Sequence, residues 1–149
     1  MSSSNFAHFN LDDYELIINN PAIRDFSQIG KVLGSGRPVR GLTYMLDYQL
    51  FEADPLGYHV VNHIWHWVGT CCLYFLVYRL FGSLFMAAVS AALFFFHPVH
   101  SEALVAIAHR KEMLAFTFLL LAYHSFLYWK RYPWAAVFLS LLFFILGIG

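Results

Sequence analysis

Charged side chains are scarce in this sequence, and long apolar runs take their place. Only 12% of the 149 residues are Asp, Glu, Lys or Arg, whereas 60% are hydrophobic and 19% aromatic. Between Tyr58 and His97 the only such charge is Arg79. Stretches this apolar and this poor in charge are typical of integral membrane proteins, and the sequence predicts one.

Three further absences narrow the class. The formal net charge is zero, which argues against a nucleic-acid partner. The two cysteines, Cys71 and Cys72, are adjacent within an apolar segment, so they do not indicate a disulfide framework. The first ten residues have neither a basic region nor an apolar core, and they do not resemble a signal peptide.

The chain divides into a polar part and an apolar part. Residues 1–57 are mixed in character and carry turn signals such as Asn19-Asn20-Pro21, which predicts an extracytoplasmic loop bearing short helices. The sequence from 58 to 149 predicts a bundle of about four membrane spans, at 59–81, 83–96, 113–129 and 134–149. The second span would cover only about 21 Å at 1.5 Å per residue. The predicted fold class is therefore an all-α polytopic membrane protein.

The basic residues in the short connections predict its orientation. Arg79 separates the first two spans, and Lys130 and Arg131 separate the last two, so both turns are expected in the cytoplasm. The segment 1–57 and the segment after His97 then face the opposite side. Arg110 and Lys111 on that side oppose the positive-inside rule, and we expect these two cations to bind an anion.

The second apolar segment ends in a cluster of titratable residues, His97, His100 and Glu102, next to Pro98. Such groups at a membrane surface indicate a functional site where they face a cavity, although an ordinary helix end also fits. The spacing of apolar residues over 101–112 predicts an interfacial helix beside them. No cofactor is firmly predicted; a divalent metal at His97 and His100 stays open beside hydrogen bonding to phosphate or sugar.

Two polar motifs in the first loop suit a reaction at a phosphate. Asp12 or Asp13 could act as a general base, or form a helix N-cap. Arg37 and Arg40 could grip phosphate oxygens in a bidentate fashion, or pair with headgroups and acidic loops.

These residues, in this order, resemble a known family. The pattern is similar to the transmembrane O-mannosyltransferases with tetratricopeptide repeats (TMTC-like) and their prokaryotic relatives, within the GT-C class of glycosyltransferases. The resemblance runs from about Asp12 to Trp129. Its most specific piece is His97-Pro98-Val99-His100-Ser101-Glu102-Ala103 followed by Arg110.

The resemblance implies a membrane glycosyltransferase that moves a sugar, expected to be mannose, from a polyprenyl-phosphate donor to a hydroxyl of a protein or lipid acceptor. Transfer would occur on the lumenal or periplasmic side of the endoplasmic reticulum membrane or of a bacterial or archaeal cytoplasmic membrane. Asp12 or Asp13 would be the base, and Glu102 would orient or assist it. The remaining candidates would hold donor phosphate and sugar: Arg37, Arg40, His97, His100 and Arg110.

The sequence also departs from the family. The span expected before the acidic pair, most later spans and the tetratricopeptide repeats are absent, so we expect a fragment whose partner is the remainder of the enzyme. Two other classes stay open: a non-catalytic membrane subunit or scaffold, and a metal- or haem-binding protein built on the eight histidines.

The orientation predicts a labelling pattern. Cysteines introduced at Ser35 and Ser101 should react with an impermeant thiol reagent added from the outside, whereas a cysteine at Ser83 should not. Labelling of intact membranes with each variant measures this. The opposite pattern would contradict the orientation and the proposed side of the reaction.

Overall fold

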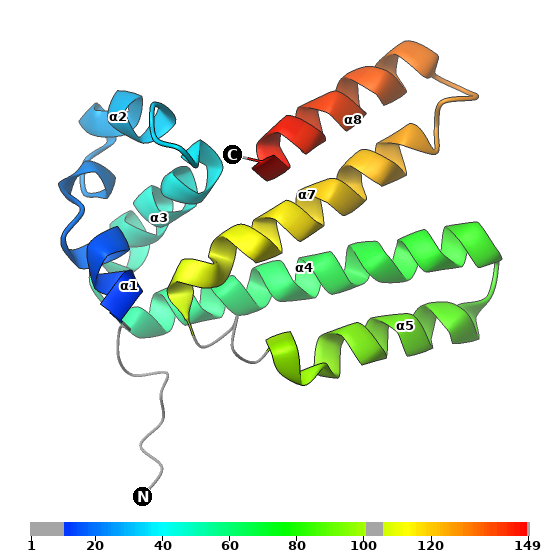
Figure 1. The fold of residues 1–149 in the computed structure, drawn as a ribbon, viewed down its shortest axis with the longest axis horizontal. Helices are drawn as coiled ribbons and strands as arrows, with labels where there is room; N and C mark the ends of the chain where they lie inside the picture. Colours follow the sequence, from blue (N-terminus) through cyan, green and yellow to red (C-terminus); the bar gives the residue numbers. More distant parts are fainter. Residues whose placement is uncertain (1–10, 101–105, 149) are drawn as a thin grey trace, which may run out of the picture.

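The computed structural model describes residues 11–100 and 106–148, and its regular elements there are all helices (Figure 1). The all-α prediction is confirmed over these residues. The chain begins with short elements: α1 (Leu11–Asp13), a π-helix (Tyr14–Ile18), two 3-10 turns (Pro21–Ile23 and Phe26–Gln28) and α2 (Ile29–Leu33). The longer α3 (Pro38–Phe51) follows, with Pro38 at its first turn, where a missing N–H costs nothing.

These first helices, residues 11–51, form an N-terminal unit with a core of its own. Fully or almost fully buried side chains from several of its elements meet Tyr58 and Ile107 from later in the chain: Ile17, Ile23, Val32, Tyr44 and Met45. The predicted loop with short helices is therefore a packed helical unit around the 14-residue α3.

The helix α4 (Pro55–Phe81) is the longest element and joins the polar and apolar parts of the molecule. The Asp54 side chain caps its start by accepting a hydrogen bond from the Leu56 N–H at 3.0 Å. At its other end Gly82 adopts a left-handed backbone with φ of 67°, a conformation that favours glycine. Ser83 then caps α5 (Leu84–Phe96), so α4 and α5 form a tight antiparallel pair.

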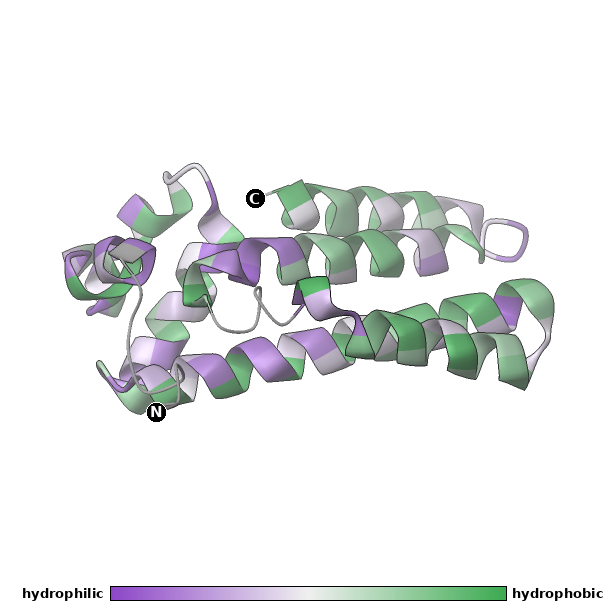
Figure 2. Ribbon diagram, turned by 60° about the horizontal axis from the view of Figure 1, so that its bottom comes forward, coloured by the Kyte–Doolittle hydropathy of each residue, from purple (hydrophilic) through white to green (hydrophobic). Residues whose placement is uncertain are grey.

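After a 3-10 turn (Ile107–His109), α7 (Arg110–Phe126) packs on α4, and α8 (Pro133–Ile148) packs on α7. The four helices α5, α4, α7 and α8 thus lie side by side in that order (Figure 1). Figure 2 shows that hydrophobic residues dominate the parts of these helices remote from the N-terminal unit, whereas polar residues gather near it.

By length and composition, α4 is the one described helix that could cross a membrane unaided, and α5 and α8 are shorter apolar helices. The bundle of four spans is thus supported only in its helical content. The predicted boundary at residue 112 is not seen, because α7 runs unbroken from Arg110. Residues 101–105, which include Glu102, lie outside the described part of the chain.

Candidate functional site

Arg110, the first residue of α7, is completely buried where three helices meet. Its Nε donates a hydrogen bond to Asn62 Oδ1 on α4 at 2.7 Å, and its Nη2 donates to the Tyr58 carbonyl oxygen at 3.0 Å. Its Nη1 forms an ion pair with the Asp47 carboxylate on α3. One guanidinium therefore ties α7 to α3 and α4.

An aromatic ring completes the surroundings of this guanidinium. The Arg110 Cζ lies 4.6 Å from the centroid of the Tyr44 ring, within the range of a cation–π interaction. The Tyr44 hydroxyl donates to the Ile107 carbonyl oxygen at 2.8 Å. Burial raises the pKa of Tyr44 to about 12, so this hydroxyl remains a donor at neutral pH. Burial also raises the pKa of the Asp47 carboxyl, while the charge and hydrogen bond of Arg110 act in the opposite direction.

This arrangement gives Arg110 a position that the sequence did not predict. Its hydrogen bonds go to protein groups and its side chain is shielded from solvent, although Arg40 also lies over the Tyr44 ring, 6.0 Å from its centroid. Phosphate binding by Arg110 stays a prediction. The candidate site residues chosen from the sequence did not include Asp47 and Asn62, although both are polar residues within helices that also bury apolar ones.

The two first-loop aspartates have different surroundings. Asp12 is exposed, whereas Asp13 is fully buried. The Ala108 N–H donates to Asp13 Oδ1 at 2.8 Å, which links α1 to the turn before α7. Asp13 thus lies next to the segment that leads into Arg110.

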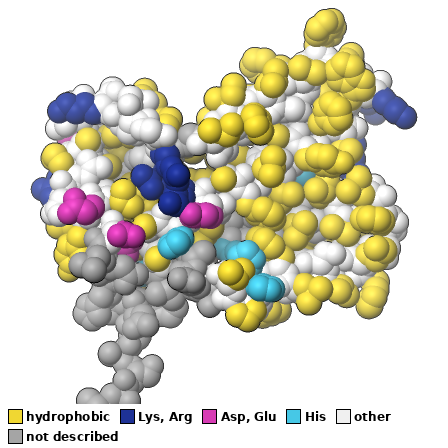
Figure 3. Space-filling model, in the orientation of Figure 1, with side chains coloured by type: hydrophobic (Ala, Val, Ile, Leu, Met, Phe, Trp, Pro, Cys, Tyr) yellow, Lys and Arg dark blue, Asp and Glu magenta, His cyan; other side chains and the backbone are white. Residues whose placement is uncertain are grey.

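Arg37 and Arg40, predicted as a phosphate clamp, line one cavity of about 260 Å³ together with Lys111 and Glu112. We call this the basic pocket. Figure 3 shows Lys and Arg side chains gathered beside an acidic one where the N-terminal unit meets the apolar helices. The Lys111 Nζ lies 3.5 Å from Glu112 Oε1, so one of its three cations is partly neutralised.

Apolar residues form the opposite wall of the basic pocket. They come from α7 and from the end of α8: Leu114, Ala115, Leu146, Gly147 and Ile148. A second cavity of about 180 Å³ shares three of these residues and continues between the same helices past Leu119 and Phe144. We call it the apolar groove. Cations at one end and hydrocarbon along the other suit an amphiphile with an anionic head.

The histidines predicted at the end of α5 lie beside a third histidine from α4. The ring centroids of His97 and His100 are 6.0 Å apart, and those of His100 and His66 are 5.2 Å apart. Burial lowers the pKa of the His100 imidazole, and the neighbouring His66 and His97 lower it further, which favours its neutral form. Within residues 11–100 and 106–148, no group of three potential ligands has the geometry to hold a metal ion.

Comparison with known proteins relates the chain to one family. It is 38% identical over 137 residues to a Caenorhabditis elegans protein O-mannosyl-transferase, covering 76% of this chain and 19% of that protein. It is 33% identical over 132 residues to human protein O-mannosyl-transferase TMTC1 (77% of this chain, 15% of the relative). The mouse TMTC3 enzyme is 37% identical over 92 residues (62% of this chain, 10% of the relative). The chain is TMTC-like.

The resemblance to the TMTC O-mannosyltransferases is therefore confirmed, whereas the relation to prokaryotic proteins and to the GT-C class stays a prediction. This TMTC-like chain spans a fifth or less of the length of these relatives. No protein-family model and no solved structure matches it.

The buried ion pair predicts a large effect on stability in the TMTC-like chain. Asp47→Ala leaves the Arg110 charge buried without its counter-ion, and we expect a loss of about 3–5 kcal/mol in the free energy of unfolding. The exposed Glu15→Ala should cost less than about 0.5 kcal/mol. Unfolding in detergent micelles, followed by circular dichroism, measures both.

A double variant separates charge burial from loss of packing. Asp47→Leu combined with Arg110→Met removes both charges and keeps apolar volume, so it should recover most of the stability lost in Asp47→Ala. A double variant no more stable than Asp47→Ala would show that the unpaired charge of Arg110 is not the main cause of the stability lost in Asp47→Ala.

Proposed function

We propose that this chain forms part of a membrane glycosyltransferase that transfers a mannosyl group from a polyprenyl-phosphate donor to a hydroxyl of a protein acceptor. The observation that carries the proposal is the basic pocket with its continuation into the apolar groove. A lipid-linked phosphate needs both features, and Ala115, Gly147 and Ile148 line both cavities. The acceptor class follows the names of the relatives, which are protein O-mannosyl-transferases.

The cations would act on the leaving group. As the glycosidic bond breaks, negative charge grows on the donor phosphate, and fixed guanidinium and ammonium groups stabilise that charge without reorganisation. Arg37 and Arg40 come from the start of α3, while Lys111 comes from α7, so two separate elements hold the phosphate from two directions. Direct displacement by the acceptor hydroxyl would invert the anomeric centre.

The membrane arrangement follows from the same geometry. In this proposal α4, α5, α7 and α8 are the spans of a GT-C type bundle, and the N-terminal unit lies at the lumenal or periplasmic surface with the basic pocket at headgroup level. The 13-residue α5 covers about 20 Å at 1.5 Å per residue, which is short for a bilayer and requires local thinning. The many exposed apolar side chains of α5 and α8 would face lipid.

The proposed base is Asp12 or Asp13. Asp12 is exposed and free to approach a substrate, whereas Asp13 is buried and accepts a hydrogen bond from the Ala108 N–H. Glu102 remains the candidate for orienting the base. His97 and His100 remain candidates for hydrogen bonding to the donor sugar or phosphate.

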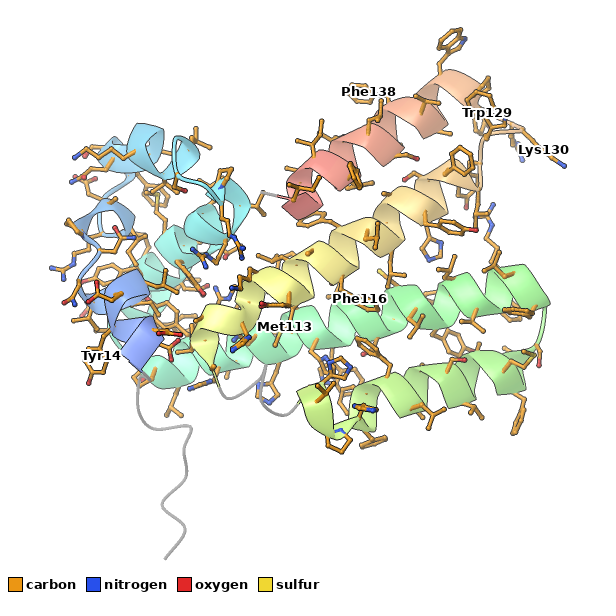
Figure 4. The ribbon with its side chains drawn as sticks, viewed as in Figure 1. Tyr14, Met113, Phe116, Trp129, Lys130 and Phe138 are labelled. Atoms are coloured by element: carbon orange, nitrogen blue, oxygen red, sulfur yellow. The ribbon has the colours of Figure 1, made fainter. Side chains whose placement is uncertain are left out.

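Removing cations from the basic pocket should weaken phosphate binding. Arg40→Gln and Lys111→Gln should each lower the affinity for farnesyl phosphate in detergent micelles about tenfold, because each removes a charged donor. Lys130→Gln, at the turn between α7 and α8, is the matched control (Figure 4). Fluorescence or calorimetric titration gives the dissociation constant of farnesyl phosphate for each variant. Equal affinities in all three variants would eliminate the basic pocket as the phosphate site.

Removing the proton acceptor should slow turnover. In an active enzyme that contains this chain, Asp12→Asn or Asp13→Asn should lower kcat about a hundredfold or more, because the amide cannot take the hydroxyl proton. Asp25→Asn, an exposed acid in the same unit, is the control. A thermal melt of each variant separates a lost base from a lost fold, which matters for the buried Asp13. Unchanged kcat in both variants would exclude this pair.

A further inference from the structure

A third cavity lies between α4, α5 and α7, on the other side of α7 from the apolar groove. This cavity measures about 210 Å³ and is mostly apolar. Its lining comes from all three helices and from the turn after α5: Trp65, His66, Gly69, Phe94, His100, Glu112, Met113, Phe116 and Thr117. We call it the aromatic pocket. Figure 4 shows Met113 and Phe116 on the side of α7 that faces α4.

Stacked rings build its walls. The Phe94 and Phe116 rings are stacked with centroids 4.5 Å apart and planes 13° apart. His66 stacks on Phe94 at 5.4 Å and contacts His100 at 5.2 Å. Rings held by one another in this way offer fixed faces and edges, which favour a planar or branched apolar group as the occupant.

A polar atom in the lining of this pocket has no partner in the described structure. Thr117 is fully buried, and its Oγ1 makes no hydrogen bond to any residue within 11–100 and 106–148. A methyl group built on Gly69 would lie 3.0 Å from this oxygen, so glycine leaves more room beside it than alanine would. Burying a hydroxyl without a hydrogen bond is unfavourable, and an occupant with a polar group would satisfy it.

The aromatic pocket and the basic pocket share one residue, Glu112. Its side chain is about half exposed, at 51%, and lies beside the Lys111 ammonium and the His109 imidazole. If one residue of a bound peptide occupied the aromatic pocket, the next residue of that peptide would therefore lie near Glu112. That position is at the edge of the space where the donor phosphate is proposed.

We propose that the aromatic pocket anchors an apolar, preferably aromatic, side chain of the acceptor polypeptide, next to the hydroxyl residue that receives the sugar. This assignment rests on the proposed function. The carboxylate of Glu112 accepts a hydrogen bond from an N–H or hydroxyl of the acceptor at the rim, and Thr117 Oγ1 meets a polar atom of the acceptor inside the pocket. A volume of about 210 Å³ accommodates one side chain of that size and no longer segment.

The hydrocarbon chain of the donor could compete for the aromatic pocket, but the apolar groove suits it better. The apolar groove leaves the basic pocket directly, between α7 and α8, and shares residues with it. The aromatic pocket opens from the opposite side of α7 and touches the basic pocket only through a carboxylate. None of the Arg and Lys side chains that line the basic pocket lines the aromatic pocket, and the Glu112 side chain there can accept hydrogen bonds from the N–H donors of a peptide.

Trp65 lines the aromatic pocket and provides a local reporter. A triple variant keeps Trp65 as the single tryptophan of this chain; its substitutions are Trp67→Phe, Trp129→Phe and Trp134→Phe. In detergent micelles, a blocked tetrapeptide with phenylalanine next to serine should shift the fluorescence emission of Trp65, and the shift should saturate as the peptide concentration rises. The same peptide with alanine in place of phenylalanine should bind about tenfold more weakly.

Two glycines give matched variants. Gly69→Ala crowds Thr117 and Phe116 in the aromatic pocket, whereas Gly147→Ala crowds Phe118 and Ala115 in the apolar groove. Gly69→Ala should weaken peptide binding about tenfold and leave farnesyl phosphate unaffected, and Gly147→Ala should do the reverse. Thr117→Val keeps the side-chain volume but removes the hydroxyl, so it should lower the affinity for the peptide about threefold. This variant tests the proposal even where Gly69→Ala fails to fold.

The outcomes separate the two proposals. Saturable, phenylalanine-dependent binding that Gly69→Ala or Thr117→Val weakens supports the acceptor pocket. A Trp65 response to farnesol without any response to the peptide overturns it and makes the cavity a hydrocarbon site, and no response to either overturns it as well. Titration with farnesyl phosphate tests the donor site alone, so its failure bears on the proposed function and not on peptide binding.

Discussion

The buried guanidinium of Arg110 holds three helices of this molecule together. It is the point at which α3, α4 and α7 meet, through Asp47, Asn62 and the Tyr58 carbonyl group. Charge burial of this kind is costly unless every donor is satisfied, so the three helices have one well-defined arrangement around it. The N-terminal unit and the apolar helices are thereby fixed relative to each other.

Helical geometry passes this constraint to the neighbouring residues. Successive side chains on an α-helix point about 100° apart, so a residue buried at the start of α7 turns the next two outward in fixed directions. Lys111 reaches the basic pocket, Glu112 reaches the rim shared by both pockets, and Phe116 and Thr117 line the aromatic pocket. Burial of Arg110 thus fixes the directions of the neighbouring side chains that the proposed chemistry uses.

Part of this arrangement was accessible from the sequence. Helical content and the apolar segments follow from composition, and Arg37 and Arg40, chosen from the sequence as a pair of guanidiniums, do line one pocket. The role of Arg110 was not accessible, because a lone cation in a polar segment reads the same whether it meets solvent or a distant carboxylate. Its partner Asp47 is 63 residues away in sequence, and only tertiary packing brings the two together.

The apolar groove and the aromatic pocket have one element in common, and this decides how a donor and an acceptor could meet. Both are lined by α7, on different faces, so the separation between them is set by the width of a single helix and does not depend on the lipid around it. Two substrates held by opposite faces can react only around an end of that helix. The end available is the one at Arg110, where Lys111 and Glu112 lie next to each other with the cations of α3 facing them.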